Sequence, residues 1–129
     1  MKSRILIVED NPLHMRLMEM TLRDKDYTLL KAVDGETAMD MAGSEIPDLI
    51  IMDIRLPGMS GFEVTRKLRE NRELNDTPII ALTAHAMAGD RDKIIKAGYD
   101  MYLSKPIDTR TLPGVIRGIL EKRLGKAQP

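Results

Sequence analysis

Charged and hydroxyl residues follow short apolar runs at four places in this sequence. The carboxylates Glu9 and Asp10 come directly after the run ILIV, and Asp53 comes directly after LIIM. Thr83 follows IIAL, and Lys105 ends the segment YLSK. Apolar runs this short are typical of buried strands, so polar residues at their ends are candidates for a shared site.

These residue types suggest phosphoryl chemistry at a metal site. Three carboxylates brought together repel one another and raise each other's pKa unless a cation offsets the charge. A set of oxygen ligands favours Mg²⁺, which keeps open positions for phosphate oxygens. Asp53 would then be a nucleophile toward a phosphoryl group, Lys105 would neutralise its oxygens, and Thr83 would donate a hydrogen bond to them. Each residue alone also fits a turn, a helix cap or a loop, so the prediction depends on their combination.

The elements that must position these residues form a regular series. Short apolar runs recur at 5–8, 27–33, 49–52, 79–82 and 101–103. Such runs are typical of strands covered on both faces, as in a parallel sheet. The segments between them have helical character, which gives a strand–helix unit repeated five times. Right-handed crossovers would place helices on both faces, and ligands bind at the carboxyl ends of the strands in such sheets.

Several helix ends are visible in the sequence. Asn11 precedes a proline and can cap a first helix, and Ser60 stands three residues before a glutamate, as in a capping box. Asp108 is predicted to cap the last helix. Gly98 follows a helical segment and is expected to end it in a left-handed conformation.

Length and composition favour one globular domain that binds proteins. The chain has 129 residues, with 43% hydrophobic and 31% charged. Its 20 basic and 20 acidic side chains cancel, and with one Phe and no Trp it lacks the surface that nucleic-acid binding needs. It has no Cys, no apolar run of membrane-spanning length and no signal peptide pattern. We expect a cytoplasmic domain over 1–124 and a flexible tail over 125–129.

Four motifs together are similar to one known family. The segments ILIVEDN, PDLIIMDIRLPGMSG, PIIALTA and YLSKPI occur in the order and spacing of bacterial response-regulator receiver domains of two-component signalling. The resemblance implies an α/β fold of the flavodoxin-like kind: a five-stranded parallel sheet in order 2-1-3-4-5 with five helices on both faces. Within the family, VEDNP and TAHAM resemble single-domain cell-division and cell-fate regulators of the DivK kind, or the receiver of a hybrid kinase.

The resemblance also assigns roles at the acidic site. It implies that Asp53 is the phosphorylated aspartate and that Glu9 and Asp10 hold Mg²⁺. The backbone carbonyl of Arg55 would be a further metal ligand.

Other positions match the family's phosphoryl contacts and its switch. Thr83 and Lys105 would contact the phosphoryl group, and the Lys105–Pro106 peptide bond would be cis. Tyr102 would be the aromatic rotamer switch, although the residue alone also fits a half-buried tyrosine. Ala84 satisfies the family's need for a small residue beside Thr83.

Two bulky residues flank the predicted phosphorylation site. Arg55 lies two positions after Asp53, and His85 lies two positions after Thr83. We expect them to slow hydrolysis of the acyl phosphate by shielding it from water. The alternative is a pair of exposed side chains without effect.

The first helix carries more apolar residues than one core-facing stripe requires. One stripe consists of Met15, Met18 and Leu22, and the other of Leu13, Leu17 and Met20. The second stripe, with His14 beside it, is expected to dock a phosphodonor helix next to the acidic site. The alternative is that most of this surface is simply core.

Three functions fit these features to different degrees. The first is a response regulator, a monomer or weak homodimer, that accepts phosphate from a histidine kinase or histidine phosphotransfer protein and acts on a downstream protein target. It would be no enzyme beyond its own phosphorylation and dephosphorylation. The second, a metal-dependent phosphatase, would have an acid two residues after Asp53, where Arg55 stands. The third, a flavin-binding module, would need a Ser-, Thr- or Gly-rich first loop in place of EDNP.

Overall fold

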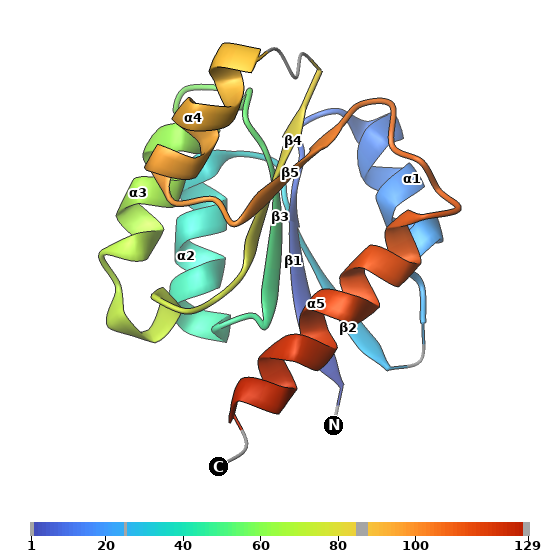
Figure 1. The fold of residues 1–129 in the computed structure, drawn as a ribbon. Helices are drawn as coiled ribbons and strands as arrows, with labels where there is room; N and C mark the ends of the chain where they lie inside the picture. Colours follow the sequence, from blue (N-terminus) through green and yellow to red (C-terminus); the bar gives the residue numbers. More distant parts are fainter. Residues whose placement is uncertain (1, 25, 85–87, 128–129) are drawn as a thin grey trace.

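The computed structural model describes residues 2–24, 26–84 and 88–127. Along the chain the elements are β1 (Ser3–Val8), α1 (Pro12–Leu22), β2 (Tyr27–Ala32), α2 (Gly35–Glu45), β3 (Leu49–Asp53), α3 (Gly61–Arg69), the 3₁₀ turn η1 (Arg72–Leu74), β4 (Ile79–Thr83), α4 (Ala88–Ala97), β5 (Met101–Ser104) and α5 (Leu112–Ala127). The strands form one parallel sheet in the order β2-β1-β3-β4-β5. The predicted fold and strand order are confirmed (Figure 1).

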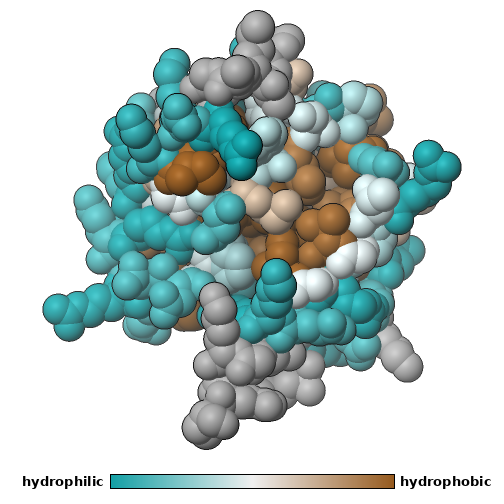
Figure 2. Space-filling view, viewed as in Figure 1, coloured by the Kyte–Doolittle hydropathy of each residue, from teal (hydrophilic) through white to brown (hydrophobic). Residues whose placement is uncertain are grey.

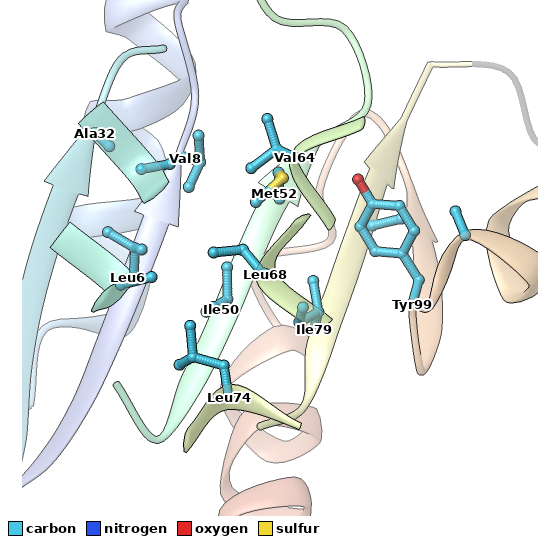
Figure 3. Packing of buried hydrophobic residues seen from close by; sticks show 14 of the residues in the cluster. Leu6, Val8, Ala32, Ile50, Met52, Val64, Leu68, Leu74, Ile79 and Tyr99 are labelled. Carbon is cyan, nitrogen blue, oxygen red and sulfur yellow. The ribbon is translucent and has the colours of Figure 1, made fainter. Parts of the chain in front are cut away.

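The sheet is the middle of three layers. One core cluster joins it to α1 and α5, and a second joins it to α2, α3 and α4 (Figure 1). Alternate residues of one strand serve the two clusters: Ile5 and Ile7 face α1 and α5, whereas Leu6 and Val8 face the other side. Figure 3 shows this second cluster, in which side chains from the strands meet those of α3. Burial on both faces explains why the strands are continuous apolar runs.

Three predicted helix ends are confirmed. The Asn11 side chain caps α1 by accepting hydrogen bonds from the Leu13 and His14 N–H groups, at 2.9 and 3.3 Å. The Ser60 hydroxyl caps α3 by accepting from the N–H of Glu63. Gly98 follows α4 with a φ of +108°. These ends fix where α1 and α3 begin, and both helices begin beside the carboxyl edge of the sheet.

The prediction that Asp108 caps the last helix is wrong. Asp108 instead closes a separate turn, in which its carboxylate accepts from the Arg110 N–H at 2.9 Å and its carbonyl accepts from the Leu112 N–H at 3.1 Å. Pro113 has no N–H and cannot extend this turn into a continuous hydrogen-bond ladder. Helix α5 therefore begins at Leu112, four residues after the predicted cap.

At the carboxyl end of the chain, α5 continues to Ala127. It therefore extends into the segment 125–129 that was expected to be a tail, and the domain boundary at 124 stays a prediction. Within the described residues, no helix combines the length and apolar character needed to cross a membrane.

Candidate functional site

A cavity of about 410 Å³ lies at the carboxyl edge of the sheet. Residues at the ends of β1, β3, β4 and β5 line it, together with the start of α1 and of α3: Glu9, Asp10, Asn11, His14, Asp53, Ile54, Arg55, Phe62, Thr83, Ala84 and Lys105. All five residues from which the chemistry was predicted are in this set. The structure thus brings together side chains that are up to 96 residues apart in sequence.

Lys105 connects two buried carboxylates. Its Nζ lies 2.6 Å from Asp53 Oδ2 and 2.7 Å from Glu9 Oε1. Glu9 is fully buried, and Asp53 is 7% exposed. The Lys105–Pro106 peptide bond is cis, as the resemblance implied. A buried carboxylate without a cation would be costly, so the ammonium group is part of what allows two of them here.

The same contacts shift the pKa values of the two partners of this ion pair. Burial raises the pKa of Glu9 above its ordinary value, and the neighbouring Asp53 raises it further, although Lys105 opposes both effects. Burial alone would lower the pKa of Lys105, but its hydrogen bonds to Asp53 and Glu9 outweigh that effect and raise it. Lys105 is therefore a full ammonium ion at neutral pH.

Three carboxylates are placed as a cation site requires. Each of Glu9, Asp10 and Asp53 offers one oxygen, and these oxygens lie within 4.8 Å of one another. Asp10 is exposed, so the cluster opens to solvent on one side. Hard oxygen donors with an open side fit Mg²⁺, which keeps several waters and takes few protein carboxylates.

Backbone groups further orient the acidic side chains. The N–H of Arg55 donates to Asp53 Oδ1 at 2.9 Å, and the N–H of Asn11 donates to Glu9 Oε2 at 3.3 Å. One carboxylate oxygen of Asp53 therefore accepts a hydrogen bond from Lys105, and the other accepts one from the backbone. The carbonyl of Arg55 as a metal ligand stays a prediction.

The predicted switch residues lie on one side of the sheet. Thr83 is the last residue of β4, is 8% exposed, and lines the cavity with Ala84. Tyr102 of β5 is paired with Ala81 of β4 and packs, half-buried, against the cluster that faces α3 and α4. Side chains alternate along a strand, so Thr83 points to the same face as Ala81. A path between Thr83 and Tyr102 is therefore available without crossing the sheet.

Helix α1 presents both of its apolar stripes as expected. Met15, Met18 and Leu22 are buried in the core, whereas Leu13, Leu17 and Met20 are 77%, 38% and 61% exposed. The exposed stripe lies on the helix whose first turns border the cavity. His14, which had been assigned to docking alone, also reaches into the site, with its Nδ1 3.2 Å from Lys105 Nζ.

Of the two residues expected to slow hydrolysis of the acyl phosphate, the structure describes one. Arg55 is exposed and lines the cavity beside Asp53. His85 lies outside the described residues, so its role stays a prediction.

Sequence reasoning missed Phe62 and Gly61. Phe62 lines the cavity from α3 and meets Tyr99 edge to face, with ring centroids 6.2 Å apart. A Cβ on Gly61 would lie 2.5 Å from the carbonyl oxygen of Asp53, so this position requires glycine. The signal that could have found Gly61 was its place directly after the capping serine, at the start of a helix that follows the acidic strand.

Comparison with known proteins decides the family. The family model of the response regulator receiver domain matches residues 5–117. The chain belongs to this family. It is 41% identical over 120 residues to the polar-differentiation response regulator DivK of Brucella ovis. The aligned region covers 93% of this chain and 98% of that protein. DivK of Brucella anthropi matches to the same extent.

Solved receiver structures share the fold. The receiver domain of a sensor histidine kinase from Pseudomonas aeruginosa is 36% identical, with a TM-score of 0.85 over 94% of this chain and 99% of that one. That structure has a magnesium ion coordinated in its active-site cleft. The chemotaxis response regulator CheY4 of Vibrio cholerae is 28% identical, with a TM-score of 0.86. The match covers 92% of this chain and 99% of that one. The chain is thus a response-regulator receiver that is similar to DivK along 93% of its length.

Proposed function

We propose that Asp53 is the phosphoacceptor of this receiver and that Glu9 and Asp10 hold Mg²⁺ with it. The observation that carries the proposal is the position of Asp53, which lies within 4.8 Å of two further carboxylates and 2.6 Å from an ammonium group. The magnesium ion in the Pseudomonas receiver supports the choice of metal.

Phosphoryl acceptance needs a nucleophile, a positive environment and a leaving group. A carboxylate oxygen of Asp53 attacks phosphorus, the P–N bond of a donor phosphohistidine breaks, and its electron pair returns to the imidazole. Mg²⁺ at the acidic cluster would supply charge that neutralises the phosphoryl oxygens. Lys105 would neutralise the same oxygens, and Thr83 would donate its hydroxyl to one of them. The donor is a histidine kinase or a histidine phosphotransfer protein.

The signal leaves the site through the face formed by α4, β5 and α5. Attraction of Thr83 toward the phosphoryl group leaves space that Tyr102 of β5 fills, and this shifts the population toward an active surface. Figure 2 shows apolar patches among hydrophilic side chains on this side of the molecule. A downstream protein recognises that surface, and Arg55 and His85 set how long the phosphoryl group lasts.

The process under control is cell polarity or division in the cytoplasm. This assignment rests on the 41% identity to DivK, which extends over 98% of that protein. The alternative, the receiver of a hybrid kinase, is supported by the 36% identity to the Pseudomonas domain. The protein acts as a switch and has no substrate other than its own phosphodonor.

The test is intact-mass measurement after incubation with acetyl phosphate. Wild type should gain one phosphoryl group with Mg²⁺ present and none with a chelator. Asp53→Asn should gain none under either condition. Turnover of an external phosphoester by many equivalents would instead favour the phosphatase interpretation.

A further inference from the structure

The ammonium group of Lys105 has three acceptors around it. Two are the carboxylates of Glu9 and Asp53, and the third is Nδ1 of His14, at 3.2 Å. An ammonium has three N–H donors and no acceptor, so these three contacts use all of them. The first two partners belong to the acidic site, whereas the imidazole comes from a different element, α1.

The position of His14 follows from how α1 begins. The Asn11 cap accepts a hydrogen bond from the His14 N–H, which fixes the backbone of this residue at the first turn. The side chain is 45% exposed, so one edge of the ring faces solvent while Nδ1 faces the site. Nδ1 lies 3.2 Å from Lys105 Nζ and 3.3 Å from Glu9 Oε1, so it can accept from the ammonium or, when protonated, donate to the carboxylate. The ammonium can only donate, so the contact with Lys105 requires the tautomer in which Nδ1 is unprotonated. The ring proton then lies on Nε2.

We propose that His14 is a positioning residue that holds the Lys105 ammonium in place for phosphoryl transfer to Asp53. The proposal rests on the function proposed above. When Asp53 becomes an acyl phosphate, its carboxylate charge is lost and appears on the phosphoryl oxygens. The hydrogen bond that Lys105 makes with Asp53 must therefore move to one of those oxygens.

The other two acceptors stay in place during this change. Glu9 Oε1 and His14 Nδ1 are not bonded to the transferred group, and they belong to different segments: Glu9 directly follows β1, and His14 lies on α1. With two fixed contacts, the flexible lysine side chain keeps its direction while the third contact changes partner. With Glu9 alone, the ammonium could rotate away from the phosphoryl oxygens, and transfer would slow.

The experiment compares His14→Leu with His14→Gln in phosphoryl uptake from acetyl phosphate at saturating Mg²⁺. Leucine keeps bulk but cannot accept a hydrogen bond, whereas the glutamine side-chain oxygen can. We expect His14→Leu to slow uptake about fivefold and His14→Gln to recover most of that loss. Arg16→Leu, an exposed position on the same helix, is the matched control and should react at the wild-type rate.

A double-mutant cycle tests whether His14 acts through Lys105. In a Lys105→Met background, His14→Leu should cause no further slowing, because the group that it positions is gone. The melting temperature of each variant is measured alongside its phosphorylation rate, to check that the variant is folded. A merely structural role would make the Leu and Gln variants equally slow and would persist in the Lys105→Met background.

The outcomes separate the two proposals. If wild type takes up phosphate but His14→Leu reacts as fast as wild type, the role of His14 is overturned and Asp53 remains the acceptor. Equal slowing by His14→Leu and His14→Gln also overturns it. So does an undiminished effect of His14→Leu in the Lys105→Met background. If wild type takes up no phosphate from this donor or from a phosphohistidine protein, both proposals are overturned together.

Discussion

Lys105 and Asp53 are 52 residues apart in the chain, and their charged groups meet at 2.6 Å. The strands that carry or precede them, β3 and β5, do not pair with each other, because β4 lies between them. Both strands are parallel and end at the same edge of the sheet, so residues at their ends converge. The ion pair is thus a product of the sheet topology.

Gly61→Ala should destabilise the protein by about 1–3 kcal/mol, because the added methyl group has no room. It would lie 2.5 Å from the Asp53 carbonyl oxygen and 2.6 Å from the Tyr99 hydroxyl oxygen. Gly43→Ala is the matched control, since nothing lies within 4 Å of its Cβ. It lies inside α2 and should stabilise by roughly 0.5–1 kcal/mol. Urea denaturation of both variants measures the two effects, and equal values would contradict the close packing at Gly61.

Glu9→Gln should raise the melting temperature of the metal-free protein at neutral pH. Burial raises the pKa of Glu9 above its ordinary 4.5, so the folded state resists ionisation more than the unfolded state does. Wild-type stability therefore falls as pH rises from 4.5 through the folded-state pKa, and this loss is absent in the variant. Each kcal/mol corresponds to about 4 °C in a chain of this length.

Melting curves from pH 3.5 to 8 measure this difference. Below pH 4.5 the Glu9 carboxyl is protonated in both states, so the advantage of Glu9→Gln over wild type should be smallest there. An advantage that stays constant across the whole range would contradict the role of Glu9 ionisation.

Mg²⁺ should stabilise wild type, and Asp10→Asn should remove most of that effect. A ligand at about 100 times its Kd adds about 2.7 kcal/mol to a protein that binds it only when folded. Asp10 is exposed, so its replacement leaves the metal-free fold intact. Asp40→Asn, an exposed position on α2 outside the cluster, is the control and should keep the full shift. Equal shifts in both variants would place the metal elsewhere.

Leu17→Ser should slow phosphotransfer from a histidine phosphotransfer protein while leaving uptake from acetyl phosphate unchanged. Leu17 is 38% exposed on the stripe of α1 beside the cavity, so it is available to a docking helix but does not line the site. Loss of one apolar anchor should cost about 1–3 kcal/mol in binding. Ile95→Ser, which removes an exposed apolar side chain from α4, is the matched control. Equal slowing with both donors would contradict the docking role of this stripe.

The sequence predicted most of the fold and the centre of the site. Apolar runs of four residues marked the central strands, and the acids at their ends converged because all the strands are parallel. Caps at Asn11 and Ser60 were found because capping is a local interaction with a fixed spacing. Asp108 failed as a cap because Pro113, five residues later, decides where the hydrogen-bond ladder of α5 can start.

Contacts between residues far apart in the chain could not be predicted from the sequence. Arg69 donates to the carbonyl oxygens of Gly98 and Thr77 and to the carboxylate of Asp100, and nothing local in its helix indicates this. The contact of His14 with Lys105 likewise depends on how α1 packs against β1 and α5. Such contacts are set by tertiary geometry, which periodicity and local spacing do not contain.

The identity of the phosphorylated residue can be measured directly. Borohydride reduction of the protein after incubation with acetyl phosphate and Mg²⁺ converts an aspartyl phosphate to homoserine, and peptide mass spectrometry locates the change. We predict homoserine at position 53 in wild type, at no other aspartate, and not in a sample treated with chelator. Homoserine at Asp10 or another aspartate, with Asp53 intact, would contradict the assignment to Asp53.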